Sequence, residues 1–329
     1  MQNTALITKL VKSKNPSIQY KTKVYLLNED TKSKEIEDIK RKIKISEMAN
    51  KLLSLRDKTG RISTNPYKKW QGPHWTLYCL AQIEYPQGDN SLLPLRDQVY
   101  EWLLSEEHLK YPRSLLIEGQ ENRFRRCASQ EGNAIWYSIK LGIEDERTAI
   151  LVDRLIKWQW PDGGWNCDKN IEARTSSFIE SLIPLRALFL YGKKNNYTKA
   201  IESGNKTAEF ILKRKLLKRL TNGKIIHQDF LKIHYPINFY DILFALKVMV
   251  EIGKINDIRC KDALELLLSK QLPNGGFPLE QKNCKTTNII ETRGSFVHWG
   301  NSGKRQMNEF ITIDALYVLM NANMLKIVS

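Results

Sequence analysis

Residues 159–165 read QWPDGGW and residues 271–277 read QLPNGGF, so the two segments correspond position by position. Both place a glutamine before a proline and two adjacent glycines, and both end in a large aromatic residue. The glycines predict a tight turn with positive φ, and Trp165 predicts a ring buried beside that turn. A motif that returns along a chain is typical of stacked structural repeats.

Two weaker copies of the motif stand at residues 56–62 (RDKTGRI) and 219–225 (RLTNGKI). Apolar residues spaced by three and four precede the stronger copies, and this spacing predicts amphipathic helices. A second kind of helix, apolar on nearly all sides, is predicted at residues 74–83, 127–142, 175–192, 236–253 and 309–323. A helix that is apolar on all sides is buried on all sides. The alternation therefore predicts an all-α fold of helical hairpins in two concentric layers.

Local signals agree with helices throughout the chain. Gly142, Gly192 and Gly253 stand where left-handed helix terminators are expected. Ser177 begins a capping-box pattern, and Pro184 is expected to kink the following helix or to move its start. No segment shows the alternation of apolar and polar residues that is typical of a strand.

Charge and cysteine content narrow the range of partners. The 329 residues include 52 Lys and Arg against 36 Asp and Glu, a formal net charge of +16. The lysines are scattered and basic runs are short, so nucleic acid is not the favoured partner. The chain has no apolar stretch of about 18 residues, so no membrane span is predicted. Five cysteines without a CxxC pair, and a start without a secretory signal, predict a cytoplasmic location.

The charge pattern also suggests two parts. Residues 1–45 are basic and predict one or two amphipathic helices, which would cap the array as terminal repeats usually must. Residues 46–329 contain all copies of the motif and no clear linker, and they are predicted to form one domain.

Gln-x-x-x-Gly-x-Trp at the end of an apolar helix resembles the repeat of the squalene cyclase and protein prenyltransferase superfamily. Residues 159–165 fit it well, and residues 271–277 have Phe in place of Trp. The resemblance covers roughly residues 45–329. Segments 125–142, 158–168 and 234–246 look most similar to single-domain bacterial members labelled squalene-cyclase-like, a label that describes fold more than chemistry.

The resemblance implies a single α/α toroid of about six hairpins, with the inner helices parallel around a central cavity. Gln159 and Trp165 would then tie one hairpin to the next. The chain lacks the Asp-x-Asp-Asp acid motif of the cyclases and the Asp-Asp-x-x-Asp magnesium cluster of ionising terpene synthases. Cyclisation of a squalene-like polyene is therefore not favoured.

Polar residues at the starts of the predicted inner helices would converge at one mouth of the cavity. Helix N-termini attract anions, and the forked donors of arginine suit phosphate or carboxylate. Alternatively, the arginines pair with carboxylates such as Glu131 and only hold loops together. The candidate ligand-binding residues are His74, Trp75, Arg126, Arg174, Glu180, Tyr235, Arg293, His298 and Trp299.

Carboxylates in an apolar cavity have a raised pKa and can donate protons. The candidate acids are Glu131, Asp168 and Asp241, with His234 and Tyr240 to relay protons or shape the site. These residues predict an enzyme whose small-molecule substrate is largely apolar with an anionic head, such as a prenyl diphosphate. The reaction would use acid–base or ionisation chemistry.

The sequence requires no cofactor. Protein prenyltransferases hold zinc with Asp, Cys and His, and the resemblance therefore also allows a zinc site of Cys167, Asp168 and His234. Cys127 is an equal candidate for the cysteine, and the spacing departs from the Asp-x-Cys pattern of that family. The oligomeric state stays open.

Two alternatives come from other functional classes. One is a carbohydrate-active α/α toroid, a lyase or hydrolase that stacks sugars on Trp75, Trp136 and Trp299. The other is a non-catalytic ligand-binding or scaffold protein. A cavity of about 300 Å³ or more favours an enzyme or carrier, whereas a centre filled by side chains favours a scaffold.

Overall fold

The computed structural model describes residues 2–110, 116–117, 120–168, 170, 172–290 and 292–325. These described residues form fourteen α-helices and four short strands, so the fold is predominantly helical, as predicted. Within the same ranges, no helix has the length and the apolar content needed to cross a membrane.

Five helices are buried along most of their length. All residues of α5 are buried, and α8 and α14 leave few side chains in solvent. These helices occupy the segments that are apolar on nearly all sides, because such helices have no face suited to water. Their bounds are α5 (Pro73–Gln82), α8 (Ser129–Leu141), α10 (Phe178–Asn195), α12 (Ile242–Glu251) and α14 (Glu309–Asn321).

One-sided helices alternate with the buried ones along the chain. In α9 the buried residues recur with a spacing of three or four, as in Leu151, Leu155 and Trp158. This pattern leaves a polar face in water and an apolar face on the neighbouring helices. The one-sided helices are α6 (Leu93–Leu104), α9 (Glu146–Trp158), α11 (Thr198–Lys213) and α13 (Lys261–Leu268).

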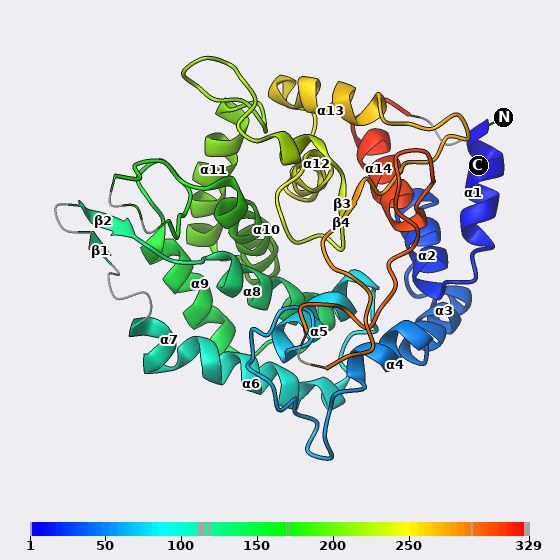
Figure 1. Ribbon diagram of the computed structural model, residues 1–329, viewed down its shortest axis with the longest axis horizontal. Helices are drawn as coiled ribbons and strands as arrows, with labels where there is room; N and C mark the ends of the chain where they lie inside the picture. Colours follow the sequence, from blue (N-terminus) through cyan, green and yellow to red (C-terminus); the bar gives the residue numbers. More distant parts are fainter. Residues whose placement is uncertain are drawn as a thin grey trace.

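Figure 1 shows how these two kinds of helix are arranged. The chain proceeds around the molecule, with α6, α9, α11 and α13 toward the periphery and the buried helices toward the middle. The buried helices α8 and α10 approach closely, since a Cβ on Gly132 would lie 2.9 Å from the backbone nitrogen of Pro184. Pro184 lies inside α10 and does not set its start.

The N-terminal segment packs against the last helix. The hydroxyl of Ser13 donates to Glu309 at 3.0 Å, and Lys21 lies 3.8 Å from Asp314, both partners being at or inside α14. One hydrophobic core runs from this segment through the rest of the chain. The segment contains α1 (Gln2–Val11), α2 (Pro16–Lys21), a π-helix (Thr22–Leu26) and α3 (Lys34–Lys44), and α4 (Glu47–Leu53) follows it.

Short elements connect the helices, and the strands among them were not expected. A 3₁₀ turn precedes α6, and two more lie before α12 and α13. β1 pairs with β2 in antiparallel fashion, whereas β3 and β4 pair in parallel. The bounds are α7 (Glu106–Lys110), β1 (Leu116–Ile117), β2 (Gln120–Phe124), β3 (His234–Tyr235), β4 (Gln281–Lys282) and the 3₁₀ turns Asn90–Leu92, Gln228–Leu231 and Ile258–Cys260.

The helix-end predictions are partly confirmed. Gly142 ends α8 at φ +63°, Gly253 follows α12 at φ +76°, and Ser177 caps α10 by accepting from the amide of Glu180. The prediction for Gly192 is wrong, because α10 continues to Asn195 and Asn196 takes the left-handed conformation. Gly192 instead allows the side chain of Ile201 to pack against the helix.

The two stronger copies of the sequence motif form the same turn. Gln159 donates to the carbonyl of Gly163 at 2.9 Å, and Gln271 donates to that of Gly275 at 3.0 Å. The amide of Trp165 donates to a hydroxyl of the following buried helix, as the amide of Phe277 does. Gln159 also donates to Ser203 and Thr207 of α11, so this residue joins α9 to the next outer helix, as predicted.

Candidate functional site

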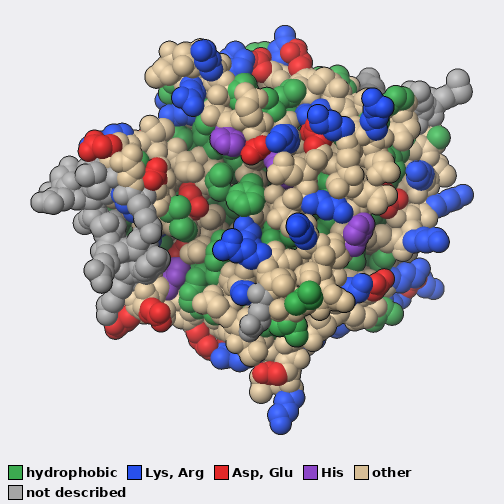
Figure 2. Space-filling view, in the orientation of Figure 1, with side chains coloured by type: hydrophobic (Ala, Val, Ile, Leu, Met, Phe, Trp, Pro, Cys, Tyr) green, Lys and Arg blue, Asp and Glu red, His purple; other side chains and the backbone are tan. Residues whose placement is uncertain are grey.

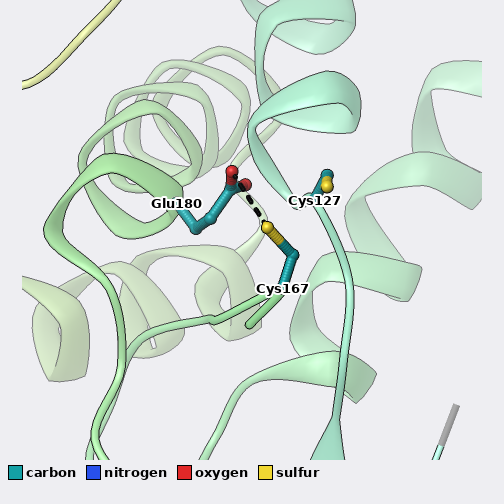
Figure 3. A group of neighbouring side chains, drawn as sticks. All are labelled: Cys127, Cys167 and Glu180. Atoms are coloured by element: carbon teal, nitrogen blue, oxygen red, sulfur yellow. Dashed lines mark hydrogen bonds between the residues drawn. The ribbon is translucent and has the colours of Figure 1, made fainter. Parts of the chain in front are cut away.

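Three chemically active side chains meet where α8 and α10 begin. Cys127 precedes α8, Glu180 lies in the first turn of α10, and Cys167 is on the loop after the 159–165 turn. Their ligand atoms, Sγ, Sγ and a carboxylate oxygen, all lie within 4.8 Å of one another. Figure 3 shows the three side chains converging from three segments. We call this group the thiol cluster.

Backbone contacts hold the segments of the thiol cluster together. The amide of Arg126 donates to the carbonyl of Asn166 at 3.1 Å, and Arg125 pairs with Asn166 as an isolated parallel bridge. The Cys167 loop therefore runs alongside the segment that carries Cys127. The Ser129 amide at the start of α8 donates to Glu180 Oε2 at 2.9 Å, which fixes the carboxylate toward the same point.

The thiol cluster brings two half-buried thiols and a buried carboxyl group together. Cys167 Sγ donates to Glu180 Oε1 at 3.6 Å. The contact with Cys127, then burial and the nearby Glu180, raise the pKa of the Cys167 thiol. Burial raises the pKa of Glu180 as well, although the Ser129 amide opposes that shift. In the protein alone, Cys167 therefore keeps its proton at neutral pH.

An aromatic wall borders the cluster. The Tyr67 ring stacks on Trp102 with 5.6 Å between centroids and lies 5.1 Å from the ring of His74. Burial, then the charges of Glu180 and Cys127, raise the pKa of the Tyr67 hydroxyl well above its usual value. His74 and Trp75, both predicted as ligand-binding, are completely buried in this wall.

A carboxylate–histidine pair lies at the first turn of α8, the end of the helix that also carries the thiol cluster. Glu131 is 1% exposed, and its Oε1 lies 3.3 Å from Nε2 of His108 in α7. The sequence led us to expect Glu131 here but not His108 or Tyr67. His108 stands in a stretch without apolar periodicity, so the only signal for it was the small number of histidines, five in the chain.

The predicted arginines do not form one anion site. Arg126 donates to the backbone carbonyls of His108 and Leu109 and lies over the Trp158 ring, so it braces α7 against α9. Arg174 and Arg293 are exposed on loops. Arg174 pairs with Glu172 at 3.5 Å.

Asp168 is also displaced from its predicted place. Its side chain is exposed and accepts from the amide of Asn170 at 3.0 Å, as the acceptor of a local turn. The prediction that Asp168 lies inside an apolar cavity is therefore wrong. Because Asp168 and His234 are not members of the thiol cluster, the predicted set Cys167, Asp168 and His234 does not come together, and Cys127 and Glu180 stand beside Cys167 instead.

His234, Tyr240 and Asp241 form a second group before α12. Asp241 caps the helix by accepting from the Phe244 amide at 2.8 Å, and its other oxygen accepts from the His234 amide at 2.9 Å. Nδ1 of His234 lies 3.5 Å from the same carboxylate, without hydrogen-bonding geometry. The Tyr240 hydroxyl donates to the carbonyl of Leu216. The carboxylate thus holds both the helix start and His234 in place.

This second group borders a large hollow, which we call the aromatic pocket. The pocket has a volume of about 800 Å³ and reaches from the start of α10 to the loop before α12. Phe230 lies 4.6 Å from the ring of Tyr240 and 5.8 Å from that of Phe178, so three rings form one wall. Arg214, Arg219 and His227 contribute polar groups. Figure 2 draws one face of the molecule and shows hydrophobic side chains near its centre, with Lys and Arg side chains beside them.

A smaller cavity of about 260 Å³ lies at the other ends of the buried helices. Arg186 stacks 3.9 Å above the Trp136 ring there and binds Glu251 through two hydrogen bonds of 2.6 and 2.7 Å. Lys21 and Lys247 also line it. In this cavity the guanidinium of Arg186 is thus paired with a carboxylate rather than free to bind an anion.

The remaining predicted residues lie in the C-terminal part. Tyr235 is buried and stacks on Phe310 at 5.2 Å, and Trp299 packs against both rings. His298 is exposed, and its Nδ1 accepts from the Gly300 amide at 3.2 Å. Tyr235 and Trp299 therefore belong to the core, whereas His298 lies on a surface loop.

Comparison with known proteins does not add to this geometry. The chain matches no known protein family, no curated protein sequence and no solved structure.

Proposed function

We propose that the chain is an α/α toroid of the squalene cyclase and protein prenyltransferase type, and that it is an enzyme for a largely apolar substrate with an anionic head. The alternation of five buried helices with four one-sided helices supports the toroid. The matching turns at residues 159–165 and 271–277 support a repeat within it. A prenyl diphosphate is the substrate class that fits this description.

The aromatic pocket is the observation that carries the proposal. Its volume of about 800 Å³ lies in the range of small-molecule sites, about 300–1,000 Å³. Phe178, Phe230 and Tyr240 offer ring faces to an unsaturated hydrocarbon chain. The hydrocarbon chain of the substrate would lie along these rings, away from water.

The polar residues of the pocket suit the head group. Arg214 uses one nitrogen on the Phe210 carbonyl at 2.9 Å, and Arg219 uses one on that of Ile226 at 3.5 Å. A guanidinium has five N–H donors, so both can also bind an anion. His234 lines the pocket, and Asp241 fixes its backbone by accepting from the His234 amide, so the imidazole is placed at the pocket as a general acid–base group.

The carbohydrate alternative has less support. It needs tryptophans at an open cleft, but Trp75, Trp136 and Trp299 are 0%, 3% and 2% exposed. A non-catalytic carrier is favoured over an enzyme by one observation: both oxygens of Asp241 and the hydroxyl of Tyr240 are occupied by backbone partners. The test below therefore separates binding from turnover.

The test compares farnesyl diphosphate, farnesol and inorganic diphosphate in titration calorimetry. Farnesyl diphosphate should bind tightest, and Phe230→Ala should weaken both farnesyl compounds about 10-fold or more, as loss of a buried ring contact does. Arg214→Gln should weaken farnesyl diphosphate but not farnesol. Arg56→Gln is the matched control, because Arg56 lies outside the pocket and donates to the Ser91 carbonyl.

Turnover is measured as release of diphosphate. An enzyme should lose release in His234→Gln while keeping its affinity for farnesyl diphosphate. If wild type releases nothing but binds, the chain is a carrier. If farnesyl diphosphate binds no better than inorganic diphosphate, or if Arg56→Gln weakens it as much as Arg214→Gln, the proposed pocket is wrong.

A further inference from the structure

We propose that the thiol cluster of Cys127, Cys167 and Glu180 is a zinc site with one open coordination position. The three ligand atoms lie within 4.8 Å of one another and come from three separate segments. The site is independent of the proposed function, since it uses no residue of the aromatic pocket. It also differs in residues from the Asp, Cys and His set that the family resemblance implies.

The distances agree with tetrahedral zinc. Zinc–sulfur bonds of about 2.3 Å and zinc–oxygen bonds of about 2.0 Å place sulfur and oxygen ligands about 3.5 Å apart, and two sulfurs about 3.8 Å apart. Cys167 Sγ and Glu180 Oε1 are 3.6 Å apart. The remaining pairs, at 4.8 Å or less, require at most a small side-chain rotation.

The surrounding structure holds the ligands in place. The backbone pairing of Arg125 and Arg126 with Asn166 fixes the two cysteine segments side by side. The Ser129 amide takes one oxygen of Glu180 and leaves Oε1 toward Cys167. A donor from the outer shell that orients a ligand is a usual feature of metal sites.

The electrostatics favour a cation that accepts thiolates. Two thiolates and a carboxylate carry three negative charges, and a divalent ion would leave one. The N-terminal ends of α8 and α10, of 13 and 18 residues, lie at the cluster and favour that negative charge. Sulfur ligands select zinc over magnesium or calcium, which prefer oxygen.

The number of ligands sets the type of site. Structural zinc is closed by four protein ligands, whereas reactive zinc keeps one position for water or a substrate. Among the described residues, only three His, Cys, Asp or Glu side chains belong to this group. The fourth position would therefore bind water or a small anionic or thiol ligand.

The test starts from the full chain, reduced and stripped of metal with a chelator. Zinc should bind at one ion per chain by mass spectrometry of the intact protein, and cobalt(II) should give the absorption of a thiolate-bound tetrahedral ion. Cys167→Ser and Cys127→Ser should each weaken zinc at least about 100-fold, since even outer-shell changes cost about 10- to 100-fold. Glu180→Gln should weaken it as well.

Cys284→Ser is the matched control, because Cys284 is a half-buried free cysteine outside the cluster. It should bind zinc as wild type does. If a serine variant fails to fold by circular dichroism, alkylation of the wild type decides: zinc should protect Cys127 and Cys167 from iodoacetamide but not Cys284. Absence of zinc binding, equal loss in Cys284→Ser, or a Cys127–Cys167 disulfide that persists under reductant would overturn the proposal.

Discussion

His74 shows how burial alone sets the protonation state of one residue. It is 0% exposed and lies among the rings of Tyr67, Trp75, Trp102 and Tyr137. Burial, followed by the charges of His108 and Lys69, lowers the pKa of His74 to about 3. Its imidazole is therefore neutral in the folded protein, and it takes up a proton only with difficulty.

This shift predicts a loss of stability in acid. The unfolded chain protonates His74 near pH 6.5, but the folded protein resists until about pH 3, so the unfolded state gains protons first. His74 should therefore lower the free energy of unfolding as the pH falls below 6.5, by about 3 kcal/mol at pH 4. His74→Gln should lose this part of the pH dependence in urea unfolding between pH 7 and 4.

His227→Gln serves as the control for that measurement. His227 is exposed, so its replacement should leave the pH dependence of stability as in wild type. An equally steep acid loss in wild type and His74→Gln would contradict the role assigned to His74.

Single residues also show what could not be predicted from the sequence. The types Cys, Asp and Glu near residue 167 indicated chemistry, but one step along a loop separates Cys167, half-buried in the cluster, from the exposed Asp168. Helical periodicity does not extend into such a loop, so it could not assign the two side chains to opposite environments. The partner Glu180 was recognised as polar in a buried helix, but its role beside two thiols needed the folded chain.

At the scale of elements, the contact between α8 and α10 depends on a missing side chain. Gly132 lies inside α8, where alanine would be the better helix former by about 1 kcal/mol. An alanine Cβ there would lie 2.9 Å from the Pro184 nitrogen and 3.0 Å from its Cα. These are backbone atoms of a packed helix and cannot move aside cheaply.

Gly132→Ala should therefore destabilise the protein by about 1–3 kcal/mol, as overpacking does, despite the gain in helix propensity. Gly192→Ala is the matched control in α10, because the nearest atoms to its Cβ would belong to the Ile201 side chain, which can rotate aside, and the Tyr197 carbonyl oxygen would be 3.2 Å away. It should be near neutral in thermal unfolding. Equal effects of the two substitutions would show that the α8–α10 distance is not set by Gly132.

The positions of helices were predicted from the sequence more completely than the surroundings of single residues were. The five segments that are apolar on all sides form the five buried helices. A helix that is buried on every side has apolar residues on all its faces, so its sequence is easy to recognise. Gly142 ended its helix and Gly192 did not, since Asn196 could take the left-handed turn four residues later. The short strands escaped prediction because two to five residues are too few to show an alternation.

At the scale of the whole molecule, a buried ion network joins distant parts of the chain. Asp314 of α14 accepts from Lys247 of α12 at 2.8 Å and lies 3.8 Å from Lys21 of α2. Burial would raise the pKa of Asp314, but Lys21 and Lys247 together outweigh it and lower the pKa. Burial lowers the pKa of Lys21 to about 8, and Asp314 only partly opposes this.

Asp314→Asn should remove the nearest counter-charge of two buried lysines and destabilise the protein by about 3–5 kcal/mol, the usual cost of breaking a buried pair. Asp262→Asn is the control, since its pair with Lys218 is about one third exposed and lies near the surface, where such pairs are worth about 1 kcal/mol or less. Denaturant midpoints at pH 7 measure both. A small effect of Asp314→Asn would mean that water reaches the lysines.

The sequence did not predict this network. Lys21 lies in a segment that reads as a basic cap, and nothing local distinguishes it from the scattered surface lysines. Its partner is almost the whole chain away, and such long-range pairing follows from the arrangement of helices rather than from any local pattern. Several residues between 214 and 230 that line the aromatic pocket, such as Arg214 and Phe230, were likewise not among the predicted site residues.

The packing of α2 against α14 has a consequence for synthesis on the ribosome. Helix α2 leaves the exit tunnel long before α14, yet Lys21 gains its contacts with Asp314 and Phe310 only when α14 arrives. The nascent chain must therefore carry Lys21 without these two partners while all the residues between α2 and α14 are synthesised. A chain that stops shortly before α14 lacks these contacts, so a premature stop codon near residue 309 should yield a protein that is degraded, which its steady-state level in cells would show.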